Sequence, residues 1–338
     1  LKAQSEFVDY EGIGFGIIEA SHRSDVFKKI LANTEATIRE LLSISDDYAV
    51  LFLQGGASLQ FAMVPMNLMV DGTPALYADT GSWTRNAIKE AKKIGDARVV
   101  FDGATTNYTQ IGEFNEWEGV TAAASYLYIC SNNTIAGTQY HFFPEVNGVP
   151  LIADMSSDIM SRRVDVSKFG VIFAGAQKNL GPAGVTLVII RRDLAERVAD
   201  KVPTMLKYST HIDKGSTFNT PPVFAIYMVG LVAQWVKEQG GLAGIEKINN
   251  AKAQSLYDRI DATDFYHGTA EVADRSKMNV TFRLPSEELE DAFVKEAATH
   301  NLVGLKGHRS VGGVRASIYN AMPMAGVSAL IDFMNEFE

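Results

Sequence analysis

The sequence predicts an α/β protein in two parts. The larger part is a domain with a mainly parallel sheet of seven short strands covered by helices, and the smaller part is an α+β domain at the C-terminus. Segments with helical periodicity alternate with short apolar segments from about residue 24 to residue 230, as in βαβ units. This pattern changes after Gly240-Gly241, and a chain of 338 residues is longer than most single domains.

Seven strands and four helices are predicted in the large domain, residues 20–235. The strands are short and apolar, as expected for strands covered on both faces: 48–53, 75–79, 97–101, 126–130, 151–154, 171–175 and 185–190. Helical spacing of apolar residues predicts helices over 25–42, 59–69 and 82–94. The apolar segment 223–236 is too short to span a membrane, because a span needs roughly 20 residues, and we interpret it as a buried helix.

The C-terminal domain is predicted over residues 236–338, and residues 1–19 are expected to join it. An amphipathic helix runs through Ile260. A strand over 278–284, a helix over 285–300 that begins with acidic residues, a strand over 314–318 and a helix over 327–337 follow. The predicted domain is therefore built of alternating helices and strands.

Composition excludes several classes of protein. Hydrophobic residues make up 46% of the chain and charged residues 21%, which excludes disordered and fibrous proteins. A net charge of -9 disfavours binding to nucleic acid. The single cysteine, Cys130, allows no intramolecular disulfide and no cysteine-based metal site, and we predict no metal. With no membrane span and no intact signal peptide in the first twenty residues, we expect a cytoplasmic protein.

The strongest local signal is a lysine at the end of a predicted strand. Lys178 follows the segment 171–175 and precedes a glycine-rich stretch that ends at Gly184. Open α/β sheets bind ligands at this edge, and glycine lets the backbone approach a ligand closely. A lysine amine that loses its water in such a crevice can form a Schiff base. The alternative is a surface lysine in a turn.

An aspartate follows another predicted strand. Asp154 ends the apolar segment 149–153 and stands 24 residues before Lys178, about one βαβ step. Neighbouring strand ends would bring the carboxylate and the amine into one crevice. A pyridoxal phosphate site needs both, because the lysine binds the aldehyde and an acid holds the pyridine nitrogen protonated. The alternative for Asp154 is a helix cap.

A third signal is an anion site at a helix start. Gly55 and Gly56 lie between a predicted strand and a predicted helix, and a hydroxyl residue, Ser58, follows. Backbone N–H groups and the helix dipole bind anions at such a turn. An ordinary capped turn is the alternative. The glycines from Gly12 to Gly16 follow no strand, so a dinucleotide site there has little support.

Together these segments resemble the phosphoserine aminotransferases, pyridoxal phosphate enzymes of fold type I. The segments that carry the resemblance are 51–60, Asp79-Thr-Gly-Ser-Trp83, Asp154-Met-Ser-Ser-Asp158, 174–184, Asn219-Thr-Pro-Pro222 and 308–317. The resemblance covers residue 19 to the C-terminus, although the family's usual opening Asn-Phe-x-Ala-Gly-Pro segment is absent. It implies transfer of an amino group from glutamate to 3-phosphohydroxypyruvate, which yields phosphoserine in serine biosynthesis. A second substrate, phosphohydroxythreonine of vitamin B6 synthesis, is left open.

The resemblance implies a role for each candidate residue around the cofactor pyridoxal 5'-phosphate. Lys178 would bind the aldehyde, Asp154 would pair with the ring nitrogen, and these two with Trp83, stacked on the ring, form the catalytic set. The remaining cofactor ligands would be Ala57, Ser58 and Gln177 at the phosphate and Thr134 at the phenolic oxygen. In the family, Asn219 and Thr220 reach the phosphate of the neighbouring subunit, so a complete site requires a homodimer.

The resemblance also implies that cationic side chains bind the substrate. They are two His-Arg pairs, His22-Arg23 and His308-Arg309, followed by Arg315. Such groups suit a phosphate and an α-carboxylate. From the residues alone, each pair is interpreted as a solvated surface element. His141, His211, His267 and His300 are interpreted as structural or exposed, and Cys130 as a packed residue or pocket lining.

Three alternative functions remain at this stage. A cysteine desulfurase would need a cysteine in a mobile loop, whereas Cys130 lies in a predicted strand. An alanine–glyoxylate type aminotransferase would use one arginine and leave the second His-Arg pair without a role. The third alternative is a non-catalytic protein that binds the cofactor.

Overall fold

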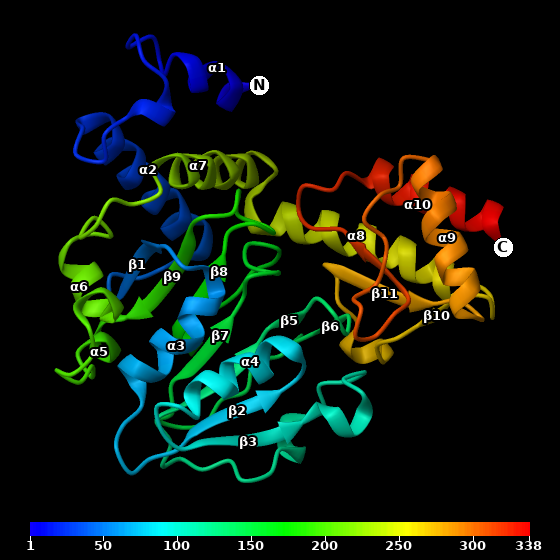
Figure 1. Ribbon diagram of the computed structural model, residues 1–338, viewed down its shortest axis with the longest axis horizontal. Coiled ribbons are helices and arrows are strands. Elements are labelled where there is room, and N and C mark those ends of the chain that lie inside the picture. The colour runs from blue at the N-terminus through cyan, green and yellow to red at the C-terminus, as the bar shows by residue number, and fades with distance from the viewer.

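The computed structural model describes residues 1–338, and a seven-stranded sheet forms the centre of its larger part (Figure 1). The strands are β1 (Tyr48–Leu53), β2 (Ala75–Asp79), β3 (Ala97–Asp102), β4 (Tyr126–Cys130), β7 (Leu151–Asp154), β8 (Phe169–Gly175) and β9 (Thr186–Arg191). Their order in the sheet is β1-β9-β8-β7-β4-β2-β3. Only β9 pairs antiparallel with its neighbours, β1 and β8. The predicted, mainly parallel sheet of seven strands is therefore confirmed.

Helices cover both faces of this sheet. They are α2 (Asp25–Leu42), α3 (Gly56–Leu68), α4 (Ser82–Ala91), α5 (Arg192–Ala195), α6 (Tyr208–Asp213) and α7 (Val223–Glu238). Within β4, Leu127 and Ile129 belong to the core beneath α2 and α7, whereas Tyr126 and Tyr128 belong to the core beneath α3 and α4. This alternation follows from the twofold side-chain period of a strand. It explains why these strands are apolar throughout.

The observed limits of α2 agree with the prediction, whereas those of α3 differ from it. Helix α2 covers the predicted residues, and the Ser24 hydroxyl caps it by accepting from the Phe27 N–H at 3.3 Å. Helix α3 begins at Gly56, three residues before the predicted start. Gly55 has φ of 90°, a left-handed conformation that suits glycine and turns the chain from β1 into α3. The first turn of α3 therefore begins with small residues, and Ser58 in it is exposed.

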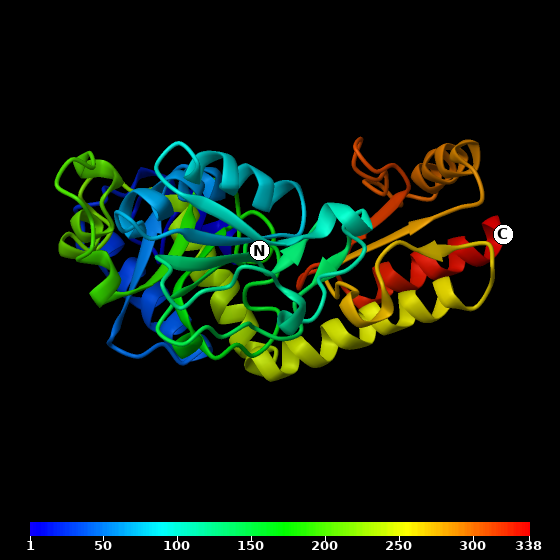
Figure 2. The same ribbon diagram turned by 90° about the horizontal axis from the view of Figure 1, so that it is seen from below.

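The C-terminal part is a three-stranded antiparallel sheet packed against helices. Its elements are α8 (Gly241–Asp261), β10 (His267–Gly268), β11 (Asn279–Arg283), α9 (Glu287–Thr299), β12 (Val314–Ser317) and α10 (Met324–Phe337). The strand order is β10-β11-β12. Figure 2 shows α8 running beneath both parts of the molecule. Its start at Leu242 and Ile245 packs in the large core, and its end from Ala253 packs in the C-terminal core. The boundary between residues 235 and 236 stays a prediction.

Several short elements were not predicted. They are α1 (Lys2–Val8), the hairpin of β5 (Asn132–Asn133) and β6 (Thr138–Gln139), and turns of 3₁₀ helix at Ile17–Glu19, Gly103–Thr106, Phe114–Glu116, Val166–Lys168, Thr204–Leu206 and Val272–Asp274. Elements of two to four residues carry too few side chains to show a period, and α1, with seven residues, spans only about two turns. The β5-β6 hairpin matters because it lies directly after β4, at the edge where the candidate residues gather.

The N-terminal segment packs on the large domain, which corrects the expectation that residues 1–19 accompany the C-terminal domain. The Tyr227 hydroxyl of α7 donates to the Glu6 carboxylate, and the ring of Phe7 lies edge-on to that of Phe224, with centroids 5.7 Å apart. Tyr10 and Ile17 complete a small apolar cluster with α2 and α7. This segment buries the apolar face of α7 that the sheet does not cover.

Candidate active site

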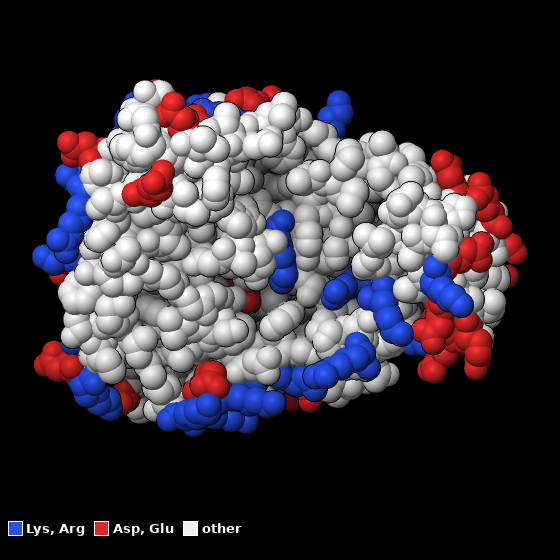
Figure 3. All heavy atoms as spheres, turned by 45° about the horizontal axis from the view of Figure 1, so that its top comes forward, with Lys and Arg blue, Asp and Glu red and all other residues white.

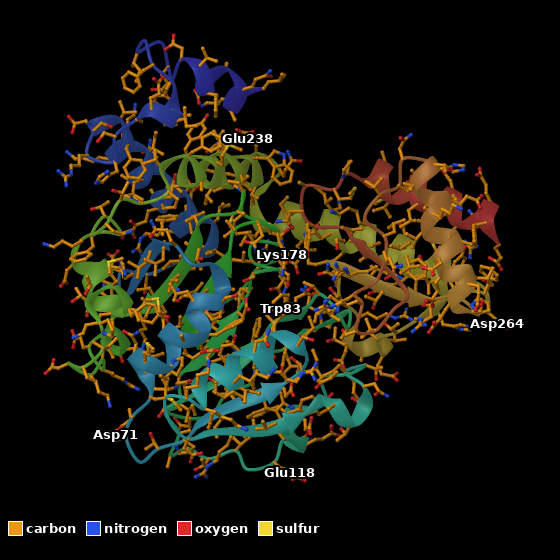
Figure 4. All side chains as sticks on the ribbon, in the orientation of Figure 1. Asp71, Trp83, Glu118, Lys178, Glu238 and Asp264 are labelled. Atoms are coloured by element: carbon orange, nitrogen blue, oxygen red, sulfur yellow. The ribbon has the colours of Figure 1, made fainter.

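The carboxyl ends of β7 and β8 bring the lysine and the aspartate together. Asp154 is the last residue of β7, and Lys178 follows β8 by three residues. The lysine Nζ lies 5.5 Å from the centre of the Trp83 ring, at the start of α4. Figure 4 shows Lys178 and Trp83 close together near the junction with the C-terminal domain. The three residues of the predicted catalytic set therefore meet at one edge of the sheet.

Asp154 is a buried carboxylate, with a relative exposure of 5%. Burial raises its pKa, while a hydrogen bond from the Ser156 N–H, at 2.9 Å, and the charge of Lys178 act in the opposite direction. A buried carboxylate of this kind is stabilised by a cationic partner. A protonated ring nitrogen would be such a partner. The donor set at these strand ends therefore fits pyridoxal phosphate.

Thr134 connects the stacking residue with the C-terminal domain. The Trp83 indole N–H donates to the Thr134 hydroxyl at 3.2 Å. Arg315, in β12, donates from Nη1 to the Thr134 carbonyl at 3.0 Å. The Nε of Arg315 is buried and has no hydrogen-bond partner. An unpaired buried donor costs free energy, so the guanidinium of Arg315 is left incompletely paired within its own chain.

The predicted phosphate site lies at the start of α3. Ala57 and Ser58 are in its first turn, Ser58 is exposed, and Gly56 also has a positive φ, of 65°. A helix of 13 residues directs its free N–H groups and its dipole toward this turn. Gln177 is exposed beyond the end of β8. The structure thus offers an open anion cradle, and the roles of these residues stay predictions.

Asn219 and Thr220 lie beside this turn within their own chain. The Asn219 amide donates to the Gln54 Oε1 at 3.1 Å, and the Gln54 amide donates to the Thr220 carbonyl at 2.7 Å. Gln54 directly precedes the Gly55-Gly56 turn. The structure describes a single chain, so the predicted role at a neighbouring subunit is untested.

The five predicted substrate-binding residues do not gather in one place within the chain. His308 and Arg315 line the same cavity of about 240 Å³, together with Thr281. Arg309 lines a different hollow, beside Glu287, Glu290 and Asp291, and makes no ion pair. His22 and Arg23 precede α2, and both ribbon views place this segment away from the loop of residues 307–313 (Figures 1 and 2). Only two of the five therefore share a cavity.

The cavity lies between the two parts of the molecule, because residues of both parts line it, Tyr108 and Ile135 from one and His308 and Arg315 from the other. Figure 3 shows a groove between the two parts, with a basic side chain inside it and more basic side chains along its rim. A neighbouring cavity of about 210 Å³ is lined by Trp83, Arg85, Tyr108, Ser310 and Val311 among others. A groove that basic groups line suits an anionic substrate.

Sequence reasoning missed Arg85 and Tyr108. The Arg85 guanidinium lies 5.1 Å from the centre of the Tyr108 ring, and the Tyr108 hydroxyl donates to Asp79 at 3.4 Å. Arg85 stands on the same helix as Trp83, and its Nη2 donates to the Ser82 hydroxyl at 3.3 Å. The signal that could have found Arg85 is its place in the first turn of the helix that follows the strand end at Asp79. Tyr108 lies in a loop and gives no comparable signal.

Cys130 and His211 are packed side chains, as interpreted from the sequence. Cys130 ends β4 at 3% exposure, and burial raises the pKa of its thiol well above the ordinary value. A buried thiol is a poor nucleophile. His211 is buried, with its Nε2 hydrogen-bonded to the Met205 carbonyl at 2.9 Å. Neither residue has a place in the groove.

The fold and the site define an aminotransferase of class V, since the family model for aminotransferase class-V matches residues 2–330, and the chain belongs to that family. The chain is 53% identical to the phosphoserine aminotransferase of Desulfosudis oleivorans over 99% of its own length and 92% of that protein. The solved phosphoserine aminotransferase from Bacillus circulans subsp. alkalophilus is 50% identical, with a TM-score of 0.97 over 99% of this chain and 93% of that one. Within class V, the chain is therefore a member of the phosphoserine aminotransferases.

A solved relative also supports the cofactor. The pyridoxal-phosphate-bound phosphoserine aminotransferase from Trichomonas vaginalis is 35% identical, with a TM-score of 0.93 over 98% of this chain and 94% of that one. Together with the class-V family, it implies pyridoxal 5'-phosphate for this chain. None of the helices is both long and apolar enough to cross a bilayer.

Proposed function

We propose that this chain transfers the amino group of glutamate to 3-phosphohydroxypyruvate, which gives O-phosphoserine and 2-oxoglutarate in serine biosynthesis. The observation that carries this function is the similarity to phosphoserine aminotransferases, at about half identity over nearly the whole chain. A panel of oxo-acid acceptors with glutamate as donor tests it. If the enzyme accepted glyoxylate in preference to 3-phosphohydroxypyruvate, the result would favour the alanine–glyoxylate type. If it turned over no acceptor, the result would favour a protein that only binds the cofactor.

The residues of the site divide the work of this reaction. When bound, pyridoxal phosphate supplies an aldehyde that condenses with amines and a ring that stabilises negative charge at the substrate Cα. The Lys178 amine would bind the aldehyde, and once free it would take the substrate Cα proton and return it, because the side chain stays tethered at this site. Asp154 would hold the ring nitrogen protonated, and Trp83 would provide a flat face for stacking.

We propose that substrate anions are bound from the C-terminal domain. Arg315, which lines the cavity, would bind the α-carboxylate. His308, in the same cavity, would bind the distal phosphate together with Arg309 of the same loop. For Arg309 this requires a turn of the loop toward the cavity, and Gly312 and Gly313, both with φ of 70°, supply the flexible backbone for it. The distal carboxylate of glutamate would occupy the same position in the other half of the reaction.

Substitutions of Arg309 and Arg315 should distinguish binding of the distal phosphate from binding of the α-carboxylate. Arg309→Leu should lower kcat/KM for phosphoserine by roughly 10- to 100-fold and leave alanine unchanged, because charge-assisted hydrogen bonds contribute about 1.5 to 3 kcal/mol each and alanine has no distal anion. Arg315→Leu should lower kcat/KM for both amino acids alike. Arg309→Lys should restore part of the loss, since it supplies charge without the planar fork. Equal losses for alanine and phosphoserine in Arg309→Leu would show a structural role.

We further propose that the enzyme is a homodimer and that each site uses residues from both subunits. Asn219 and Thr220 would reach the phosphate of the neighbouring cofactor. His22 and Arg23, which precede α2 and do not line the cavity of His308 and Arg315, would reach the substrate of the neighbour. We also propose a cytoplasmic location, since the one cysteine is reduced and buried.

Mixing two inactive variants tests the shared site. In a hybrid of Lys178→Ala and Thr220→Arg subunits, one site would hold an intact Lys178 from one chain and an intact Thr220 from the other. An equal mixture should therefore recover up to about a quarter of the wild-type activity after subunit exchange. If Thr220 instead served its own subunit, beside Gln54, both hybrid sites would be damaged and the mixture would stay inactive. A fully active monomer in sedimentation would also contradict the proposal.

A further inference from the structure

Two buried asparagines join the large sheet to the C-terminal sheet. Asn132 lies in β5, directly beyond β4, at 1% exposure, and Asn279 is the fully buried first residue of β11. Asn132 Nδ2 donates to Asn279 Oδ1 at 2.9 Å and to the Ser157 hydroxyl at 2.8 Å. The Ser276 hydroxyl donates to Asn132 Oδ1 at 2.5 Å. Both amides are thus satisfied in a water-excluded place, where a change of position would leave polar atoms unpaired.

The pairing of β11 with β12 links Asn279 to the strand that holds Arg315. Asn279 Nδ2 donates to the Ser317 hydroxyl and to the Tyr319 hydroxyl, each at 3.1 Å. In the antiparallel register, Asn279 is opposite Ser317, and Thr281 is opposite Arg315. Because Arg315 and Ser317 are two residues apart on one strand, their side chains leave the same face of the sheet. The position of Asn279 therefore sets the position of the arginine.

A second contact completes a closed ring of interactions. Arg315 donates to the carbonyl of Thr134, which stands only two residues after Asn132. One short segment of the large domain thus holds β11 through Asn132 and β12 through Thr134. The guanidinium uses Nη1 for this contact, and the Arg315 side chain lines the cavity.

We propose that Asn132 and Asn279 are positioning residues that place Arg315 for the substrate α-carboxylate before any substrate binds. This inference rests on the proposed role of Arg315. Both substrates carry an α-carboxylate, so the placement acts on both halves of the reaction. Preorganisation of this kind lowers the cost of binding. Its loss raises KM for both substrates more than it lowers kcat, because the carboxylate is bound in the ground state and the transition state alike.

The test compares two buried asparagines in the full-length holoenzyme. Asn279→Leu removes the link to Asn132 and to Ser317 and should raise KM for glutamate and for 3-phosphohydroxypyruvate by roughly two- to tenfold, with kcat within about twofold. The matched control is Asn249→Leu. Asn249 is 2% exposed and donates to the Ser161 carbonyl at 3.0 Å and to Asn320 Oδ1 at 2.8 Å, outside β11 and β12. It should lower Tm by a similar amount and leave both KM values unchanged.

Two further variants keep the test decisive. Ser317→Ala removes one contact between Asn279 and β12, so it should raise both KM values to a smaller degree even if Asn279→Leu does not fold. Asn279→Leu added to Arg315→Leu should raise KM no further, since it acts through that arginine. Unchanged KM in Ser317→Ala, an equal KM rise in Asn249→Leu, or additive effects in the double variant would overturn the inference. An Arg315→Leu enzyme with wild-type KM would instead overturn the role of Arg315, and the inference with it.

Discussion

Lys178→Ala should lower kcat by roughly 10³- to 10⁴-fold or more, because it removes both the amine that binds the cofactor and the group that moves the Cα proton. Steady-state transamination with glutamate and 3-phosphohydroxypyruvate measures this loss. Borohydride reduction followed by peptide mapping should place the pyridoxyl group on Lys178. The lysine stands at the end of β8, 5.5 Å from the Trp83 ring, so no change of fold is needed for the amine to act.

Lys89→Ala provides the matched control for this experiment. Lys89 is exposed on α4, the same helix that carries Trp83, and it should be replaceable without loss of activity. The variant Lys178→Ala should keep the wild-type Tm in the absence of cofactor, since its side chain is only half-buried. A label on another lysine, or normal turnover by Lys178→Ala, would refute the assignment.

Asp154→Asn should lower kcat by roughly 10²- to 10³-fold, because an amide of the same shape cannot stabilise a positive charge on the ring nitrogen, and removal of one partner of a buried pair costs about 3 to 5 kcal/mol. The carboxylate is buried at 5% exposure, with Ser156 and Lys178 as its close polar neighbours. Steady-state kinetics and the absorbance spectrum of the cofactor measure the effect. The spectrum of the bound cofactor should change while Tm keeps its wild-type value, a combination that a loss of fold would not produce.

Asp71→Asn is the control for the carboxylate. Asp71 is exposed at the far end of the sheet from Lys178 (Figure 4), so its charge has no role in the groove. Its replacement should leave kcat and the spectrum unchanged. If Asp154→Asn kept normal kcat with a normal spectrum, Asp154 would be only a cap that accepts the Ser156 N–H.

Local sequence patterns predicted most of the fold. The strand at 48–53 and the helix at 25–42 have the predicted limits. Both limits depend on local signals, the period of the apolar residues and the Ser24 cap, which are visible in the sequence. The helix predicted over 82–94 ends at Ala91, and the strand predicted over 278–284 covers Asn279–Arg283. These differences arise where ends are set by turns and not by the apolar period. The expectation that segment 1–19 accompanies the C-terminal domain is wrong. Nothing in the local sequence shows that an apolar face of α7 stays uncovered by the sheet and packs against this segment.

The sequence by itself determined the class of fold, the strand ends that carry Asp154 and Lys178, and the cofactor chemistry those two residues allow. These features depend on residues that are neighbours in the chain. The carboxyl end of a strand in an open α/β sheet is where ligands bind, whatever the details of packing around it. Only the tertiary structure decided that His308 and Arg315 share a cavity while Arg309 does not. It also decided that Asn132 meets Asn279 across 147 residues. Such contacts depend on how two sheets pack, and packing depends on the shapes of many side chains at once.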